Sequence, residues 1–219
     1  MTPLEDAIRN LTTAALLDDK TPLGNAIYLN QTLNNLNSRG KKHVVMAGDL
    51  NGFKAVNTEH TYRGGDAAIQ RVGETIVQAV KVFPETLAFR QSGDEFTLTA
   101  LEENVHAVAD ALSRHLKRVD VAYEGKVFHV GMSFGWALAD PTVDVRTWLT
   151  RAEDACKAAK AKGSGTVIEW TPELKTDVEE LRLRCGGCGC AFDVKLPAAE
   201  APKPSELWCP RCGRQGRAS

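Results

Sequence analysis

Two adjacent acidic residues, Asp94 and Glu95, stand between two apolar runs and constrain the fold more than any other feature of the sequence. The runs are residues 86–89 and 96–101, and Gly93 lies in the short polar break between them. Two strands joined by a tight turn fit this pattern, because glycine supplies the backbone freedom that a turn needs. The sequence therefore predicts a β-hairpin that carries two carboxylates at its tip.

A third acidic residue, Asp49, ends an earlier apolar run at residues 43–48. Consecutive apolar positions are typical of a buried central strand. If this strand lies beside the hairpin in one sheet, Asp49 meets Asp94 and Glu95 at one edge. Such a cluster suits Mg²⁺, which binds through one or two carboxylates together with the phosphate oxygens of a substrate.

The rest of the chain up to residue 170 alternates between helical and strand periodicity. The β-α-β-β-α-β core of this order is ferredoxin-like, so an α/β sandwich of the palm type is expected. The predicted elements are a helix at about 22–39, a strand at 43–50, a helix at 65–82, the hairpin at 86–100, a helix at 102–118, a strand at 127–139, a helix at 144–162 and a strand at 166–170.

Both ends of the chain carry segments outside this core. Residues 1–17 predict an amphipathic helix, which either packs on its own domain or pairs two subunits. The core domain is expected over 18–170, and a short connecting helix over 171–184. Residues 185–219 form a separate module that contains five of the six cysteines.

The C-terminal cysteines predict a zinc ribbon. Cys185 and Cys188 form one C-x-x-C knuckle, and Cys209 and Cys212 form another. Two knuckles at this spacing present four thiolates to one tetrahedral Zn²⁺. Cys190 is an alternative to Cys188. Such a ribbon provides a protein contact or a dimer contact, or a nucleic-acid contact through the arginines near its end.

Composition excludes some classes of protein. The formal net charge is −1, so no overall field favours nucleic acid or an anionic membrane. No apolar run reaches the roughly 20 residues that span a bilayer, and the first residues lack the pattern of a signal peptide. A cytoplasmic protein with no membrane contact is expected.

Five blocks of the sequence resemble GGDEF domains, the diguanylate cyclases. Ser92-Gly93-Asp94-Glu95-Phe96 resembles the signature itself, with serine for the first glycine. The other blocks follow the order and spacing of the family over about residues 18–170. They are 18–29, resembling D-x-L-T-G-L-x-N-R-R-x-F, 49–57, resembling D-h-D-x-F-K-x-h-N, the strand 133–135 and the helix 151–160, with Gly65-Asp66 at the family's G-D pair.

The resemblance implies the condensation of two GTP molecules into cyclic di-GMP with release of pyrophosphate, in a homodimer that brings two half-sites together. It implies Mg²⁺ or Mn²⁺ bound by Asp49, the Leu50 carbonyl, Asp94 and Glu95, with Glu95 also acting on the attacking 3′-hydroxyl. It further implies that guanine and phosphate binding fall to Asn57, Asp66 and Lys160.

Several positions depart from the family pattern. Asn51 replaces a second acid, Tyr62 replaces a histidine, and Ser164 stands where an arginine near the phosphates is expected. Residues 83–86 lack the R-x-x-D motif of the inhibitory product site, so feedback inhibition there is not expected. Two alternatives remain open: a related cyclic nucleotide synthase with another product, and a non-catalytic domain that binds GTP or a partner.

Overall fold

The computed structural model describes residues 15–37, 42–174, 178–184, 188 and 190–197. The chain divides into two compact units, Met1–Thr171 and Pro172–Ser219. This division lies one residue from the end predicted for the core domain. Residues 1–14 of the helix predicted at 1–17, and most of the proposed zinc ribbon, fall outside the described residues.

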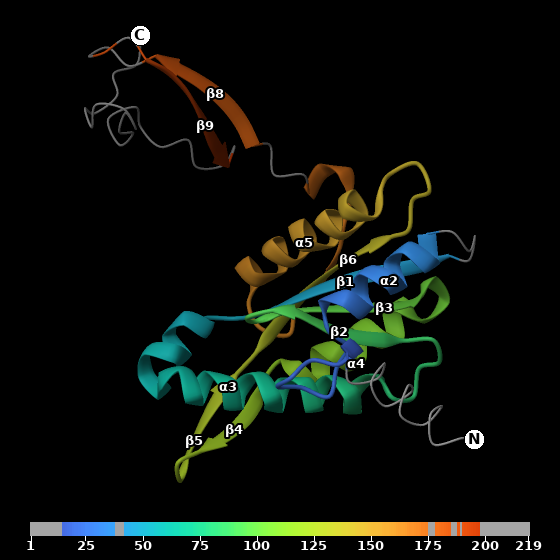
Figure 1. The fold of residues 1–219 in the computed structure, drawn as a ribbon, viewed down its shortest axis with the longest axis vertical. Coiled ribbons are helices and arrows are strands. Elements are labelled where there is room, and N and C mark those ends of the chain that lie inside the picture. Colours follow the sequence, from blue (N-terminus) through green and yellow to red (C-terminus); the bar gives the residue numbers. More distant parts are fainter. Residues whose placement is uncertain (1–14, 38–41, 175–177, 185–187, 189, 198–219) are drawn as a thin grey trace. The chain divides into compact units, whose positions relative to one another are not determined.

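A five-stranded sheet forms the centre of the first unit (Figure 1). Its strand order is β2-β3-β1-β6-β7, with β7 parallel to β6 and every other pair antiparallel. This arrangement confirms the ferredoxin-like expectation and puts the 43–50 strand in the middle of the sheet. The strands are β1 (His43–Leu50), β2 (Leu87–Ser92), β3 (Glu95–Leu101), β6 (Met132–Leu138) and β7 (Val167–Glu169).

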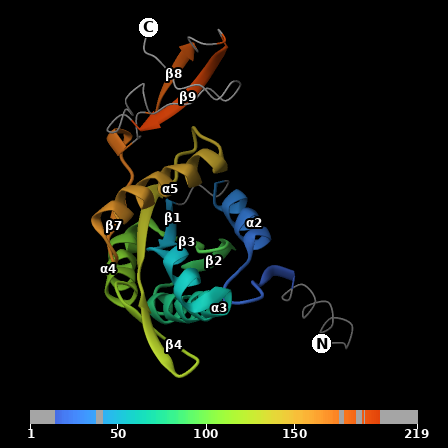
Figure 2. The same cartoon turned by 90° about the vertical axis from the view of Figure 1, so that its left-hand side faces the viewer.

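Helices cover both faces of this sheet (Figure 2). α2 (Ala26–Asn37) and α5 (Val145–Lys162) lie on one face, and α3 (Phe53–Val80) and α4 (Val105–Leu116), which follows a short 3₁₀ turn at Glu102–Asn104, lie on the other. Alternate residues of β1 enter separate apolar cores, with Val45 on the α2 and α5 side and Met46 on the α3 and α4 side. The strand is therefore buried on both faces, as its continuous apolar run predicts.

α3 begins twelve residues earlier than the predicted helix at 65–82. It starts after Gly52, which has a φ of 69° and lies at the end of the turn that follows β1. The helix is interrupted at Thr61, where φ is 62°. The first segment lacks a continuous apolar face, and this is why periodicity detects only the second segment. The kink separates Asn57 and Asp66 into two helical segments.

The strand predicted at 127–139 is two strands that belong to different sheets. β5 (Lys126–Val130) pairs with β4 (Val119–Tyr123), which was not predicted, and β6 begins after Gly131. A side chain at Gly131 would collide with the Lys117 carbonyl and Ser164. The close approach of these groups explains why the chain turns from one sheet to the other at a glycine.

The α2 helix begins at Ala26, not near Pro22. The Asn25 side chain accepts a hydrogen bond from the Tyr28 backbone N–H at 3.0 Å, which caps the first turn. Ala15 and Leu16 are helical, and residues 17–25 then form an irregular segment in which Gly24 exchanges backbone hydrogen bonds with Ala88 and Arg90 of β2. This segment is thereby fixed beside the hairpin that carries Asp94.

In the second unit, the helix predicted at 171–184 is wrong. The structure has a 3₁₀ turn at Pro172–Leu174 and then β8 (Val178–Arg184), which pairs antiparallel with β9 (Ala191–Pro197). The partner strand supplies hydrogen bonds that local sequence patterns do not reveal. Among the residues that the structure describes, no helix is long and apolar enough to cross a membrane.

Candidate active site at the acidic edge of the sheet

The three predicted carboxylates come from adjacent strands at one end of the sheet. Asp49, near the end of β1, is the direct cross-strand partner of Glu95, the first residue of β3. Asp94 precedes Glu95 in the turn after β2, where Gly93 adopts a φ of 48°. The antiparallel register of β1 and β3 brings together residues about 45 positions apart, as the sequence predicted.

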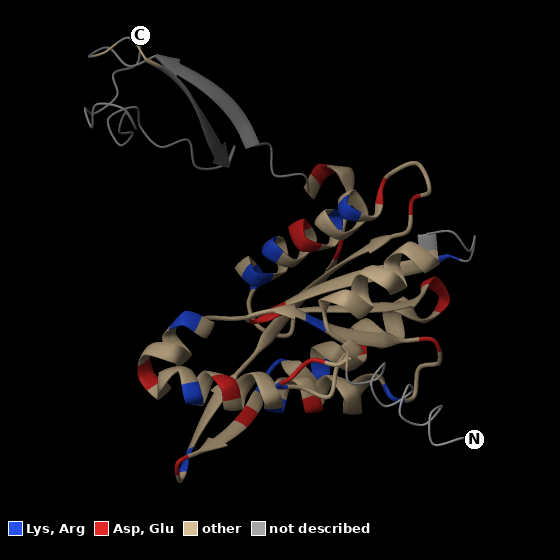
Figure 3. Ribbon diagram, in the orientation of Figure 1, with Lys and Arg blue, Asp and Glu red and all other residues tan. Residues whose placement is uncertain are grey.

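Lys160 reaches this edge from the C-terminal part of α5. Its Nζ lies 2.6 Å from Asp49 Oδ1, and both side chains are about one-third exposed. Figure 3 shows the basic C-terminal half of α5 near the acidic ends of β1 and the hairpin. α5 approaches closely because Gly135 of β6 has no side chain, and an added Cβ would meet Cys156 N at 2.0 Å.

Asp49 and Asp94 interact directly. Burial raises the pKa of the Asp94 carboxyl, and the negative charge and a hydrogen bond of Asp49 raise it further, while Lys160 lowers it. Lys160 forms an ion pair with Asp49 and acts on Asp94 through its charge. With Glu95 opposite Asp49, three carboxylates face one ammonium, and the remaining two negative charges match a divalent cation.

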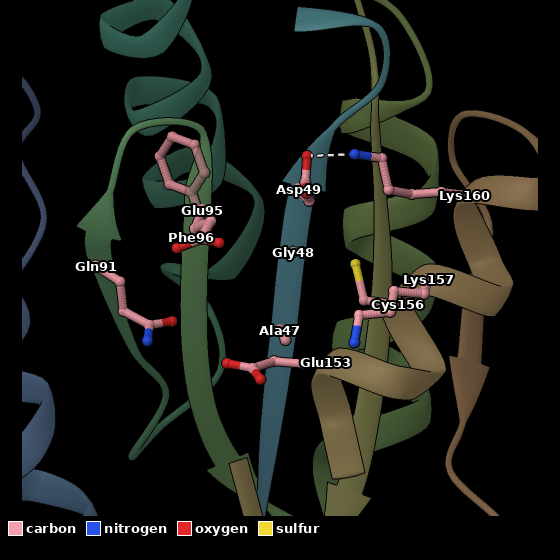
Figure 4. A pocket seen from close by; sticks show the side chains of 10 residues that line it. All are labelled: Ala47, Gly48, Asp49, Gln91, Glu95, Phe96, Glu153, Cys156, Lys157 and Lys160. Carbon is pink, nitrogen blue, oxygen red and sulfur yellow. Dashed lines mark hydrogen bonds and ion pairs between the residues drawn. The ribbon is translucent and has the colours of Figure 1, made fainter. Parts of the chain in front are cut away.

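Glu95 opens onto a pocket between β1, β3 and α5, with a volume of about 290 Å³ (Figure 4). The Glu95 carboxylate accepts a hydrogen bond from the Ser92 hydroxyl at 3.0 Å. Ser92, the departure from the family signature, therefore orients this acid. The remaining wall of the pocket includes Asp49, Gln91, Glu153, Lys157 and Lys160.

Glu153 of α5 is a pocket residue that the sequence analysis missed. Burial raises the pKa of its carboxyl, Lys157 opposes this effect, and the charge of Glu95 reinforces it. Its place within the matched helix block at 151–160 was the available signal. Cys156 also lines the pocket, and burial, together with Asp49, raises the pKa of its thiol to about 12, so it stays protonated.

The buried Arg90 side chain holds the hairpin turn in place. This residue is 8% exposed; its Nη1 donates to Asp18 at 2.9 Å and its Nε to the Gly93 carbonyl at 2.9 Å. Burial alone would raise the pKa of Asp18, but hydrogen bonds from Thr21 and the charge of Arg90 hold it below its usual value. The turn before Asp94 is thus clamped to the segment that precedes α2.

Asn57 and Asp66 lie on α3, on either side of the kink at Thr61. The Asn57 carboxamide packs against Gly65, where an added Cβ would lie 2.0 Å from Oδ1. Asp66 forms an ion pair with Lys20 at 2.6 Å and lines a second pocket of about 470 Å³ that does not include Asp49. Asp66 therefore lines a different pocket from Asp49 and Glu95, and Asn57 lines neither of the two.

The structure describes the three residues that differ from the family pattern, Asn51, Tyr62 and Ser164. Asn51 accepts a hydrogen bond from the Ser133 hydroxyl at 3.0 Å, and Tyr62 is 81% exposed. Ser164 lies against Gly131, in the loop between α5 and β7. Neither Asn51 nor Ser164 lines the pocket that contains Asp49 and Glu95.

The donor set at the acidic edge fits Mg²⁺. In the parts of the chain described by the structure, no group of three or more His, Cys, Asp or Glu side chains is arranged so that it could hold a metal ion. Mg²⁺ does not need one, because one or two carboxylates plus substrate phosphates suffice. The proposed zinc ligands Cys185, Cys209 and Cys212 lie outside the described residues, and Cys188 is exposed.

Known proteins are similar to this chain in sequence and in fold. The family described as "Diguanylate cyclase, GGDEF domain" matches residues 15–166. Diguanylate cyclase DgcS of Shewanella oneidensis is 28% identical over 167 residues, which cover 74% of this chain and 55% of DgcS. The probable diguanylate cyclase DgcE of Escherichia coli is 30% identical over 174 residues, covering 76% of this chain and 16% of DgcE. This chain thus spans about half of the first relative's length and much less of the second's.

Solved structures agree in fold. The coiled coil and GGDEF domain of DgcB from Caulobacter crescentus, in complex with c-di-GMP, has a TM-score of 0.67 at 21% identity, covering 76% of this chain and 91% of that one. Diguanylate cyclase SiaD of Pseudomonas aeruginosa, in complex with its activator SiaC, has the same TM-score and identity, and the match covers 67% of SiaD. Since the family match covers more than half of the sequence, this chain belongs to the GGDEF family.

Proposed function

We propose that this chain is a diguanylate cyclase that joins two GTP molecules into cyclic di-GMP and releases pyrophosphate. The observation that carries the proposal is the meeting of Asp49, Asp94 and Lys160 at one edge of the sheet, with Glu95 beside them. Phosphoryl transfer depends mainly on positioning and charge neutralisation, and this edge supplies groups for both.

Asp49, the Leu50 carbonyl, Asp94 and Glu95 would hold Mg²⁺ or Mn²⁺. When bound, the ion would polarise the α-phosphate and offset the charge of the departing pyrophosphate. Lys160 would pair with the substrate phosphates. In the structure its ammonium lies 2.6 Å from Asp49, one of the proposed metal ligands.

Glu95 is the proposed base. The 3′-oxygen of one GTP forms a bond to the α-phosphorus of the other, the bond to pyrophosphate breaks, and the hydroxyl proton passes to the Glu95 carboxylate. The hydrogen bond from Ser92 orients this carboxylate. Asn57 and Asp66 would hold the edge of guanine, on the α3 side of the sheet.

Cyclic di-GMP contains two such linkages, and each domain binds one GTP. Two copies of the chain would therefore face each other as a homodimer, and each copy would present one half-site. Sedimentation velocity at increasing protein concentration, with and without a GTP analogue that cannot react, tests this arrangement. A chain that makes product while it remains a monomer would contradict it.

We also propose that Cys185, Cys188, Cys209 and Cys212 bind structural Zn²⁺. In the sequence, Cys185 and Cys188 fall between β8, which ends at Arg184, and β9, which begins at Ala191. Metal analysis of the purified chain should give about one zinc per chain. Cys188→Ser should lose the metal and Cys156→Ser should keep it. Equal zinc content in both variants would exclude this ligand set.

The function is tested by incubating the purified chain with each nucleoside triphosphate and with Mg²⁺ or Mn²⁺, followed by mass spectrometry. We expect cyclic di-GMP and pyrophosphate from GTP alone. A different cyclic product would indicate a related synthase with another substrate. Binding without any product would indicate a domain that only recognises nucleotide.

A further inference from the structure

The Lys20–Asp66 ion pair combines a cation with the carboxylate predicted to bind guanine. Lys20 Nζ lies 2.6 Å from Asp66 Oδ1, and the two side chains are 39% and 50% exposed. Lys20 falls at a position where the family motif D-x-L-T has leucine, so the pairing is a feature of this chain. The two residues are 46 positions apart, which is why sequence reasoning did not join them.

The backbone that carries Lys20 is held firmly. The Lys20 and Thr21 backbone N–H groups both donate to Asp18, which is itself bound by buried Arg90. The Thr21 side chain packs on α3 at Gly73, where an added Cβ would lie 2.8 Å away. The Lys20 side chain therefore extends from a fixed turn toward the same helix that bears Asp66.

The ion pair borders a cavity that is large enough for a base. The cavity has a volume of about 470 Å³ and is lined by Asp19, Lys20, Arg63, Asp66, Ala67 and Gln70. Ligand sites commonly have volumes of about 300–1,000 Å³. Asn57, the other residue predicted to bind guanine, packs against Gly65, which precedes Asp66 in the sequence, and does not line this cavity.

We propose that Lys20 is a specificity-determining residue that selects guanine over adenine. This inference rests on the proposed function, because it assumes that guanine binds at Asp66. The Lys20 ammonium donates to guanine O6, while the Asp66 carboxylate accepts from N1–H and the exocyclic amino group. Adenine has an amino group in place of O6, so it presents a donor to the ammonium and loses that contact.

The experiment compares the equilibrium binding of two probes, the α,β-methylene analogues of GTP and ATP, which cannot release pyrophosphate. The full chain, Lys20→Met, Lys20→Arg and Lys42→Met are titrated in Mg²⁺ by calorimetry. Lys42 is the matched control, since it forms an exposed ion pair with Glu102 away from the cavity. Loss of an exposed pair changes stability by about 1 kcal/mol at most, so each variant should fold.

We expect Lys20→Met to lower the preference for the guanine analogue about tenfold, which corresponds to about 1.4 kcal/mol. Lys20→Arg and Lys42→Met should keep the preference. If Lys20→Met keeps it while Asp66→Asn loses it, guanine binds at Asp66 but Lys20 does not select it, and this inference fails alone. If Asp66→Asn changes nothing, or the wild type binds neither analogue, the proposed guanine site fails and the inference fails with it.

Discussion

The Lys160 ammonium lies 2.6 Å from the Asp49 carboxylate, although the two residues are 111 positions apart in the sequence. One comes from α5 and the other from the central strand β1. Their contact brings α5, whose Lys160 matches a phosphate-binding lysine of the family, to the carboxylates at the edge of the sheet.

Lys160→Met should weaken the affinity for GTP about tenfold, because a charged hydrogen bond typically contributes about 1.5–3 kcal/mol. It should also lower the melting temperature by a few degrees, since Asp49 and Asp94 would repel each other without the ammonium. Calorimetry and thermal unfolding measure the two effects. Lys162→Met, on the same helix end but exposed, is the control and should change neither quantity.

Asp94→Asn should raise the melting temperature slightly in the absence of divalent cations, by about 1–2 °C. The substitution removes the repulsion between Asp94 and Asp49, which stabilises the fold while it removes a proposed metal ligand. Addition of Mg²⁺ with a non-reactive GTP analogue should then stabilise the wild type and leave the variant unchanged. Equal stabilisation of both proteins would show that Asp94 does not bind the ion.

Arg90→Met should lower the free energy of unfolding by about 3 kcal/mol, since it leaves half-buried Asp18 without its counter-charge and the Gly93 carbonyl without its donor. Denaturant unfolding measures this loss. Arg71→Met removes an exposed ion pair with Glu74, so its effect should be below about 1 kcal/mol. Similar losses in both variants would contradict a clamping role for Arg90.

The Arg90–Asp18 ion pair predicts that the free energy of unfolding depends on pH. The folded protein holds the pKa of Asp18 below its usual value, so the ionised carboxylate stabilises the fold above about pH 4. This contribution is lost as the pH falls through the lowered pKa. The difference in stability between the wild type and Arg90→Met should therefore shrink between about pH 5 and pH 2. A constant difference over that range would exclude this linkage.

Gly135→Ala should destabilise the domain by about 3 kcal/mol or more. The new Cβ would collide with backbone atoms, Cys156 N at 2.0 Å and the Ala152 carbonyl oxygen at 2.4 Å, and backbone cannot move aside as a side chain can. The displaced α5 would also carry Lys160 away from Asp49. Thermal unfolding and GTP binding should both be affected, and retention of full stability would show that α5 shifts without cost.

The sequence predicted the centre of this molecule well. β1 has a continuous apolar run, and the β2–β3 hairpin, α4 and α5 have apolar patterns typical of strands and helices. The antiparallel pairing of β1 and β3, which the sequence analysis assumed as a condition, is present in the structure. The family blocks supplied the identities of Asp49, Asp94 and Lys160. Apolar patterns and family blocks are both local in sequence, and the structure brings Asp49, Asp94 and Lys160 together.

Other features depend on contacts that local patterns do not encode. β8 was predicted as helix because its pairing with β9 is non-local, and the first half of α3 was missed because its apolar face is interrupted before Thr61. Glu153 and Lys20 were missed for the same reason. Their significance comes from neighbours on other elements, the Glu95 charge and the Asp66 carboxylate.

The most direct test of the proposed site is product formation from GTP and Mg²⁺ by the wild type and Asp94→Asn, measured side by side by mass spectrometry. The geometry at Asp49 and Asp94 predicts cyclic di-GMP from the wild type and at least a hundredfold less from the variant, about 2.7 kcal/mol of transition-state stabilisation. Equal amounts of cyclic di-GMP from the two proteins would contradict it.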